Sequence, residues 1–318
     1  PFRRPSPVVY TGAGWPEFHP PDSNKGADMS TKTAAPRFGR ERYADINIDL
    51  NRACDQSPFV IAAHRGTPRG DIRENTLNGV IATTKVNADI AEIDVIRSTD
   101  GEYFAFHDGT EMARLRITDD ILSKTAAELD ELRYTEYPGA YYGNVERVAH
   151  ILSNAPDILI NIDRSWRYWS TGFLDWLDQF HLERKLILKC PVAEAFQQAL
   201  HDHETKYMFM GMIQSPDELD LFVGDEQINT VGVELVATTE DTPLADPAVF
   251  RTISEHGLYS FVNALDLGNG YCGLKGMDDT RSILEGPQHG WGALLTLGAN
   301  VIQTDWPEKL DEYRRVIA

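Results

Sequence analysis

Two histidines and two carboxylates with the spacing needed for chemistry lie between residues 59 and 108. They are His64, Glu92, Asp94 and His107. Imidazoles accept and donate protons near neutral pH, and paired carboxylates repel each other unless a positive charge lies between them. The types alone therefore suggest proton transfer beside a bound cation, provided that the fold brings the four side chains together.

Two predicted strands position three of these residues. The apolar run 59–63 reads as a buried strand that ends on His64, Arg65 and Gly66. The run 90–96 reads as a second strand, and because side chains alternate along a strand, Glu92 and Asp94 share one face. Two acids are thus predicted to point to the same side.

The Asp100-Gly101 pair that follows is typical of a hairpin with a two-residue loop. In that register two paired residues have numbers that add up to 201, as 94 and 107 do. Asp94 is therefore expected directly opposite His107. The inference depends on the loop length, because a slip of one residue would turn His107 to the other face of the hairpin.

All-oxygen ligands favour a hard divalent ion, which leads to the prediction that Glu92 and Asp94 bind Mg, Ca or Mn. The alternative is an ordinary solvated hairpin whose acids pair with Arg97 or Arg65. Spacing alone does not separate the two interpretations.

Five ordered motifs in this stretch resemble the glycerophosphodiester phosphodiesterase family, and a weaker likeness extends over roughly residues 58–310. The motifs are His64-Arg65-Gly66, Glu74-Asn75-Thr76, Glu92-Ile93-Asp94, Asp100-Gly101 and His107-Asp108. The resemblance implies hydrolysis of glycerophosphodiesters to glycerol 3-phosphate and an alcohol, hence a place in lipid or glycerol metabolism. It also implies one divalent cation, Mg or Ca or else Mn, and a small-molecule phosphodiester as partner.

The resemblance also implies roles for individual residues. His64 and His107 would share the general acid and base work, and Arg65 would bind the phosphate. Asp163 stands where the family places its third metal-binding acid, usually a Glu followed two residues later by Lys; here Ser165 occupies that later position. The missing cation would then come from Lys189, as a second substrate-binding residue.

Two other functions fit the same residues. Related phospholipase D-like enzymes use an Asp as third ligand, so Asp163 favours a phospholipase D-like or cyclic-phosphate-forming lyase acting on lysophospholipids. A noncatalytic barrel that binds a phosphorylated ligand is the third interpretation, which the departure at Ser165 would favour if nothing compensates for it.

Alternating strands and amphipathic stretches after residue 58 predict an α/β fold, a (β/α)8 barrel with a β-hairpin insertion after strand 2. A doubly wound open sheet is the alternative. The predicted barrel strands cover 59–63, 90–95, 158–162, 185–189, 207–213, 230–235, 259–264 and 301–304. Between the second and third, 125–132 and 146–153 are expected to be helices and 134–143 an aromatic loop.

The first residues have a different composition. Prolines and aromatics are interleaved there, which disfavours regular structure. We expect residues 1–50 to form an extended arm, through which a homo-oligomer could assemble, and residues 51–318 to form the barrel domain.

Composition limits the partners. The formal charge of −19 disfavours nucleic acid and anionic membranes, and the absence of a long apolar run excludes stable membrane insertion. Cys54, Cys190 and Cys272 are too few and too widely spaced for a disulfide scaffold or a zinc site. Localisation is left open between the cytoplasm and export, since residues 1–28 lack a signal-like apolar core and the numbering starts at Pro1.

Overall fold

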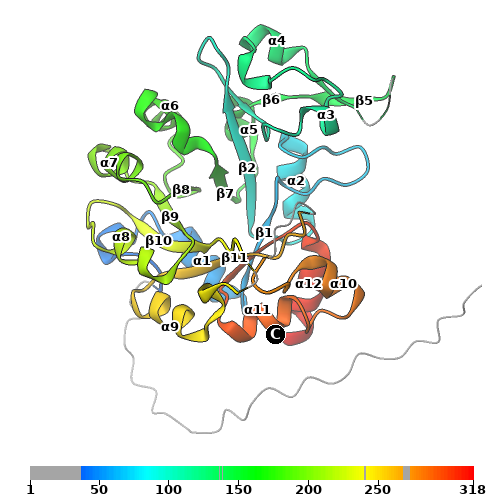
Figure 1. Ribbon diagram of the computed structural model, residues 1–318. Helices are drawn as coiled ribbons and strands as arrows, with labels where there is room; N and C mark the ends of the chain where they lie inside the picture. The colour runs from blue at the N-terminus through cyan, green and yellow to red at the C-terminus, as the bar shows by residue number, and fades with distance from the viewer. Residues whose placement is uncertain (1–36, 136, 138, 240, 268–272) are drawn as a thin grey trace, which may run out of the picture.

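Parallel strands close into a barrel in the computed structural model, which describes residues 37–135, 137, 139–239, 241–267 and 273–318 (Figure 1). The first strand, β1, pairs with β2 on one side and with β12 on the other, so this sheet has no open edge in the barrel. The predicted (β/α)8 barrel is confirmed, and the open doubly wound sheet is wrong. The barrel strands are β1 (Val60–Ala63), β2 (Ile90–Arg97), β7 (Leu159–Asp163), β8 (Leu186–Pro191), β9 (Met208–Ile213), β10 (Thr230–Leu235), β11 (Tyr259–Asn263) and β12 (Val301–Thr304).

Helices follow the strands and cover the outside of the barrel. A large apolar cluster, with Trp291, Phe173 and Ile302 among its buried members, fills the space between the strands and these helices. The helices are α2 (Leu77–Lys85), α5 (Val148–Asn154), α6 (Phe173–Asp178), α7 (Glu194–Asp202), α8 (Asp220–Val223), α9 (Pro247–Glu255), α10 (Asp279–Leu284), α11 (Trp291–Leu297) and α12 (Pro307–Ile317); short 3-10 turns lie at Ser165–Thr171, Pro216–Glu218 and Pro243–Ala245.

The barrel interior changes from apolar to polar along the strands. On β2 the inward positions are Ile90, then Glu92, then Asp94, and on β7 their partners in register are Leu159, Asn161 and Asp163. Since parallel strands carry every second side chain inward, three successive layers result. The first layer belongs to the apolar core and the last reaches the carboxyl ends of the strands, which is where barrels of this type place their functional groups.

Residues 37–56 close the amino-terminal end of the barrel. They hold the 3-10 turn Glu41–Tyr43 and helix α1 (Ile48–Gln56), and Phe38, Leu50 and Cys54 are buried against the lower interior layer. Thus the expected arm is not extended where the structure describes it, from residue 37 to residue 50. Residues 1–36, and with them most of the expected arm, lie outside the described residues.

An insertion follows β2 and stands above the barrel beside its open end (Figure 1). It has its own apolar cluster, built on Phe104, Phe106, Leu129 and Tyr134. Its elements are β3 (Tyr103–Ala105), α3 (Glu111–Arg114), a 3-10 turn (Ile121–Ser123), α4 (Ala126–Asp130), β4 (Arg133–Thr135), β5 (Tyr141–Asn144) and β6 (Glu146–Arg147).

Three predictions for this region need correction. The aromatic segment 134–143 is not only loop, because its two ends belong to the antiparallel pair β4–β5. The helix expected from residue 146 begins at Val148, since Glu146 and Arg147 pair with β3 instead. The helix expected over 125–132 spans only Ala126–Asp130.

The hairpin register is also shifted by one residue. Val95 pairs with Ala105 and Arg97 with Tyr103, and the Phe106 amide donates to the Asp94 carbonyl at 3.1 Å. Asp94 is therefore opposite Phe106, and the prediction that it faces His107 is wrong. The loop has three residues because Gly101 adopts φ +103°, a left-handed conformation that ends a tight turn with one extra residue.

No helix in the described part of the chain combines the length and the apolar character that crossing a lipid bilayer requires. Cys54 and Cys190 are buried free thiols, whereas Cys272 lies outside the described residues.

Candidate active site

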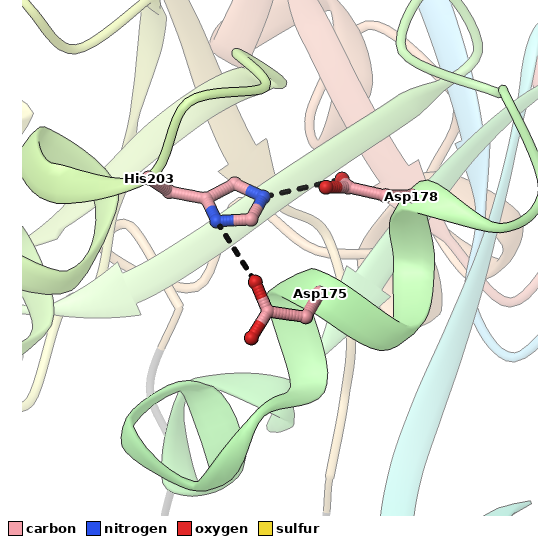
Figure 2. A group of neighbouring side chains, drawn as sticks. All are labelled: Asp175, Asp178 and His203. Atoms are coloured by element: carbon pink, nitrogen blue, oxygen red, sulfur yellow. Dashed lines mark hydrogen bonds and ion pairs between the residues drawn. The ribbon is translucent and has the colours of Figure 1, made fainter.

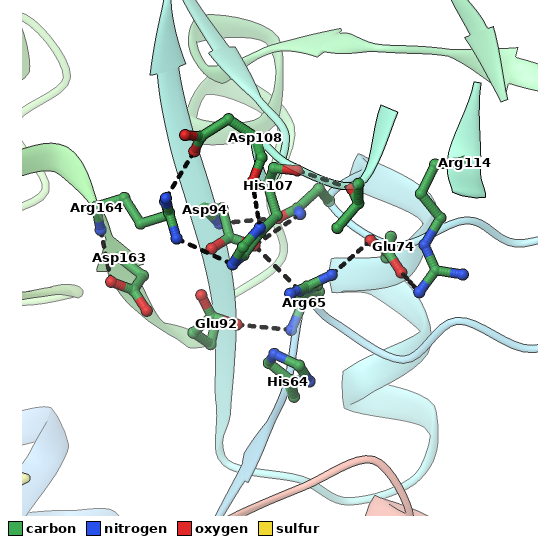
Figure 3. Close-up of polar contacts among 12 residues, drawn as sticks. His64, Arg65, Glu74, Glu92, Asp94, His107, Asp108, Arg114, Asp163 and Arg164 are labelled. Atoms are coloured by element: carbon green, nitrogen blue, oxygen red, sulfur yellow. Dashed lines mark hydrogen bonds and ion pairs between the residues drawn. The ribbon is translucent and has the colours of Figure 1, made fainter. Parts of the chain in front are cut away.

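Three acids meet at the carboxyl ends of β2 and β7 (Figure 3). One carboxylate oxygen from each of Glu92, Asp94 and Asp163 lies within 4.8 Å of the other two. Glu92 and Asp94 are buried, and Asp163 is partly exposed. The expectation of solvated acids in the alternative interpretation is wrong, since the barrel interior encloses two of them, but Asp94 does pair with Arg65 as that interpretation expected.

Glu92 is the least satisfied of the three. Its Oε2 accepts a hydrogen bond of 2.8 Å from the Arg65 amide, whereas Oε1 is buried without a hydrogen-bond partner among the described residues. Burial, and then the charges of Asp94 and Asp163, raise the pKa of Glu92 well above its ordinary value, against a smaller lowering by Lys189. This carboxylate lacks a positive neighbour on one side.

Asp94 is held from two sides. The Asn75 side chain donates to Asp94 Oδ2 at 3.0 Å and accepts from the Asp94 amide at 2.8 Å. The Arg65 Nε lies 3.2 Å from the same Oδ2. One buried amide side chain thus fixes both the backbone and the carboxylate of Asp94.

Arg65 lies beside the acids in a chain of alternating charges. Its Nη1 donates to Glu74 Oε1 at 2.9 Å, and Glu74 Oε2 pairs with Arg114 at 2.7 Å on its other side (Figure 3). Burial lowers the pKa of Arg65, but the charges of Asp94, Glu74 and Glu92 outweigh that effect and raise it. The guanidinium is consequently always charged and its position is fixed by acids.

His64 follows β1 and is oriented by an acid from the opposite end of the chain. Its Nδ1 lies 2.8 Å from Asp305 Oδ1, just after β12, so Nε2 is the nitrogen left for the site. Burial raises the pKa of Asp305, but the hydrogen bond and charge of His64, helped by Arg65 and Arg69, lower it overall. The Asp305 carboxylate can therefore stabilise a positive charge on His64.

His107 is oriented from the insertion side. Its Nδ1 lies 2.8 Å from the Asp108 carbonyl, and its Nε2 lies 3.0 Å from Arg164 Nη1. Because a guanidinium only donates, Nε2 is the acceptor in this arrangement and Nδ1 carries the proton. Arg164 and Arg167 both pair with the Asp108 carboxylate. In the view of Figure 3, His107 is drawn above Glu92 and His64 below it.

Lys189 lies on β8 next to Asp163 of β7 and is buried. Its Nζ lies 2.8 Å from Asp163 Oδ2 and 3.0 Å from Glu234 Oε2, and the side chain is 1% exposed. In this arrangement Lys189 holds Asp163 in place; contact with a substrate stays a prediction.

Three further residues belong to the site and had no assigned role in the sequence reasoning. Asn75 stood inside a recognised motif, Asp305 was one of several polar residues that end strands, and Arg164 directly follows the expected third ligand. Arg164 is the informative case. Ser165 is buried and its hydroxyl accepts from the Trp169 indole, whereas Arg164, one residue earlier, places its guanidinium 3.0 Å from His107 Nε2.

The acid cluster fits a divalent cation. All of its possible ligand atoms are carboxylate oxygens, and one of them, Glu92 Oε1, is buried without a hydrogen-bond partner among the described residues. The charges of Asp94 and Asp163 raise the pKa of Glu92. Lys189 pairs with Asp163 and Arg65 pairs with Asp94, but Glu92 Oε1 has no partner among the described residues. A hard divalent ion that binds oxygen ligands would supply the missing positive charge.

A second group of possible ligands fits a cation less well. Asp175, Asp178 and His203 meet on the outer surface, but the carboxylates contact different ring nitrogens, Nδ1 and Nε2, on opposite sides of His203 (Figure 2). A single ion cannot use both nitrogens of one ring. The Tyr207 hydroxyl also donates to Asp178 at 2.7 Å, so a structural network explains these contacts.

Comparisons with known proteins support the fold. A family model described as a domain of unknown function, DUF4996, matches residues 207–314, about a third of the chain. No curated protein matches the sequence. Among solved structures, a glycerophosphoryl diester phosphodiesterase from Parabacteroides distasonis has a TM-score of 0.64 at 15% identity, covering 81% of this chain and 87% of that one.

Two other solved structures are similar. A glycerophosphodiester phosphodiesterase from Agrobacterium tumefaciens has a TM-score of 0.55 at 19% identity, covering 81% of this chain and 99% of that one. A phosphodiesterase from Oleispira antarctica, in complex with the product sn-glycerol-3-phosphate, has a TM-score of 0.56 at 15% identity, covering 82% and 98%. At such identities the likeness concerns the fold.

Proposed function

We propose that this protein is a divalent-cation-dependent phosphodiesterase that hydrolyses glycerophosphodiesters to glycerol 3-phosphate and an alcohol. The observation that carries the proposal is the cluster of Glu92, Asp94 and Asp163 at the open end of the barrel, with its unpartnered Glu92 Oε1. The similar solved structures are named as phosphodiesterases, and the motifs of this chain resemble those of the glycerophosphodiester phosphodiesterase family, which supports the same conclusion.

The three acids would hold one Mg, Ca or Mn ion. When bound, such an ion neutralises the phosphate oxygens and favours loss of a proton from a coordinated hydroxyl. Asn75 and Lys189 orient two of the ligands, Asp94 and Asp163. Arg65, whose guanidinium lies 3.2 Å from Asp94, and Arg164, whose guanidinium lies 3.0 Å from His107, would attract the phosphate.

The two histidines would divide the proton transfers. His64 presents Nε2 because Asp305 holds Nδ1, and His107 presents Nε2 beside Arg164. One imidazole would take a proton from the nucleophile while the other gives a proton to the departing oxygen, with an expected contribution of at least about a hundredfold to the rate.

A cyclic-phosphate-forming activity is the second candidate, since the proposed third ligand is Asp163 rather than a Glu. In that reaction a neighbouring hydroxyl of the substrate attacks the phosphorus and the alcohol departs, leaving a cyclic phosphate as the product. Phosphorus NMR distinguishes this product from glycerol 3-phosphate directly.

The proposal is tested by incubating the purified protein with a panel of glycerophosphodiesters and lysophospholipids, with Mg, Ca or Mn and with EDTA. We expect cation-dependent release of glycerol 3-phosphate, and at least about a hundredfold slower turnover in His64→Ala and His107→Ala. His289→Ala, at an exposed position outside the site, is the matched control. Absence of turnover with every cation would instead support a noncatalytic phosphate-binding barrel.

A further inference from the structure

Arg164 connects the strand that carries the third acid to the insertion (Figure 3). It directly follows Asp163 at the end of β7, and its backbone amide donates to Asp163 Oδ1 at 2.6 Å. Its guanidinium extends to the insertion, where Nη2 lies 2.8 Å from Asp108 Oδ1 and Nη1 lies 3.0 Å from His107 Nε2. One side chain thus begins at a proposed cation ligand and ends on a proposed catalytic histidine.

This contact covers the ring nitrogen that His107 would use. The Nδ1 of His107 carries a proton and lies 2.8 Å from the Asp108 carbonyl, so Nε2 holds the free lone pair of the ring. The Arg164 guanidinium donates to that lone pair. While this hydrogen bond is made, Nε2 cannot accept a proton from a nucleophile. Proton transfer by His107 therefore requires Arg164 to move.

Asp108 does not depend on Arg164 for a partner. Arg167 Nη1 lies 3.2 Å and 3.1 Å from the two oxygens of the same carboxylate. Burial raises the pKa of Asp108, but the charges of Arg164 and Arg167 outweigh burial and lower that pKa overall. If Arg164 moved away, the Asp108 carboxylate would keep Arg167, so two guanidinium groups share an acid that needs one.

The Arg164 guanidinium is also incompletely hydrogen-bonded where it lies. Its Nε is buried without a hydrogen-bond partner among the described residues, and the partner of Nη1 is a neutral ring nitrogen. A buried donor without a partner costs free energy. A phosphate accepts two parallel hydrogen bonds from a guanidinium and carries negative charge, so it binds a guanidinium more strongly than a neutral imidazole does.

A phosphate at the acid cluster would be within reach of this side chain. The Arg164 backbone is hydrogen-bonded to Asp163, one of the three clustered acids. The side chain therefore starts beside the place where a cation and its phosphate would lie. Rotation about side-chain bonds between staggered rotamers is enough to turn the guanidinium from the insertion to that place.

We propose that a phosphate bound at the acid cluster draws the Arg164 guanidinium away from His107, which frees Nε2 for proton transfer. Arg164 covers His107 until a phosphodiester is in place and then binds its phosphate. The inference rests on the proposed function and adds a step to it, because it couples phosphate binding to the availability of one histidine.

The first test asks whether Arg164 covers His107. Diethyl pyrocarbonate modifies an imidazole through a free lone pair, and peptide mass spectrometry gives the rate at His107 alone. In EDTA at about pH 7.5, His107 should react at least about fivefold faster in Arg164→Met than in the unmodified protein, because a charged donor has been removed. Arg167→Met is the matched control: it removes a guanidinium from the same carboxylate, leaves the His107 contact, and should change the rate less than about twofold.

The second test asks whether Arg164 binds the phosphate. Calorimetric titration with glycerol 3-phosphate, with Mg, Ca or Mn in turn, should show at least about tenfold weaker binding in Arg164→Met. Arg164→Lys, which keeps the charge but loses the planar fork, should lose less. Arg167→Met should again change the affinity less than about twofold.

The inference is overturned if His107 reacts equally fast in the unmodified protein and Arg164→Met, or if both methionine variants accelerate the reaction equally. Equal affinity for glycerol 3-phosphate in the unmodified protein and Arg164→Met, or no binding by the unmodified protein with any of the cations, overturns it as well. Neither readout needs turnover. If both effects appear but no diester is hydrolysed, the proposed function fails and the coupling belongs to a phosphate-binding barrel; if diesters are hydrolysed without these effects, the inference alone fails.

Discussion

Each of the three clustered acids is bound by a residue in the left-handed conformation. The Arg65 amide donates to Glu92, the Asn75 side chain to Asp94, and the Arg164 amide to Asp163. These three residues have φ values of 56°, 56° and 62°. A non-glycine residue in this region costs of the order of 1–3 kcal/mol. At these three positions the strained backbone directs hydrogen-bond donors onto the carboxylates.

Glu92→Gln should increase stability and abolish the response to cations. In EDTA, burial and the two neighbouring acids disfavour the charged form of Glu92, so a neutral amide of the same shape should raise the free energy of unfolding. With saturating Mg, Ca or Mn the unmodified protein should gain about 2.7 kcal/mol at a hundredfold excess over Kd, and the variant little. Urea unfolding with and without cation measures both effects.

Glu234→Gln is the matched control for that experiment. Glu234 is also buried inside the barrel, but its two oxygens accept from Lys189 at 3.0 Å and from Asn263 at 2.7 Å. Removing its charge leaves Lys189 less well paired and should destabilise the protein. If both variants change stability in the same direction, the electrostatic account of Glu92 is wrong.

Asp305→Asn should impair turnover while the fold is kept. The amide loses the negative charge that faces His64 Nδ1, so we expect kcat to fall at least about tenfold. The Asp305 backbone amide would still donate to Asp279 at 2.8 Å. Asp217→Asn on the surface serves as control, and an unchanged kcat in Asp305→Asn would remove Asp305 from the mechanism.

At the scale of elements, the hairpin shows where sequence reasoning reaches its limit. The two strands and the turn residues Asp100-Gly101 were predicted, but the same pair fits a two-residue or a three-residue loop. Residues far from the turn decide between them: Phe104 and Phe106 are buried in the insertion core, which fixes one register. His107 still reaches the site because it lies beyond the paired residues, where Arg164 and Asp108 orient it.

The β1–α2 connection offers a test of how tightly an element must fit. Gly66 has φ +76°, and a Cβ there would lie 2.8 Å from the Gly79 carbonyl carbon in α2. Gly70, in the same loop, has φ +56° with nothing within 4 Å of such a Cβ. Gly70→Ala should cost about 1 kcal/mol from conformation alone, and Gly66→Ala about 1–3 kcal/mol more from the clash.

Urea unfolding of both variants gives this difference, and turnover reports its consequence. Gly66 directly follows His64 and Arg65, so its displacement should reduce activity, whereas Gly70→Ala should reduce it less. Equal stability losses in the two variants would mean that the contact between this loop and α2 is not tight.

At the scale of the whole molecule, local patterns predicted the barrel better than the site. Every barrel strand was expected because short apolar runs recur between helical stretches, and the alternation along β2 placed Glu92 and Asp94 on one side. Asp163 was expected beside them only from the family resemblance. Contacts between side chains far apart in the sequence were not predicted. Asp305 lies 241 positions from His64, and no local pattern connects them. Residues 37–56 close the amino-terminal end of the barrel, which likewise depends on tertiary packing and was not predicted.

Asp279 links the last quarter of the chain to the site. It begins α10, and its Oδ1 accepts from the Trp291 indole in α11 and from the Thr304 hydroxyl in β12, each at 2.7 Å. Its Oδ2 accepts from the Asp305 amide at 2.8 Å. Burial raises the pKa of Asp279 to about 7, although the hydrogen bonds from Thr304, Trp291 and Asp305 lower it in part.

This raised pKa predicts a loss of stability as pH rises. The folded state holds a proton on Asp279 that the unfolded chain releases near the ordinary pKa of 3.8, so the stabilisation is fully present below pH 4 and is lost as pH passes 7. The difference between the two pKa values corresponds to about 4 kcal/mol. Other carboxylates titrate in the same range, so the quantity to measure is the difference in unfolding free energy between the unmodified protein and Asp279→Asn at pH 4, 5.5, 7 and 8. As pH rises from 4 to 8, the unmodified protein should lose stability relative to the Asp279→Asn variant. A constant difference in unfolding free energy would mean that Asp279 is already ionised in the folded protein at pH 4, because its hydrogen-bond donors outweigh the effect of burial.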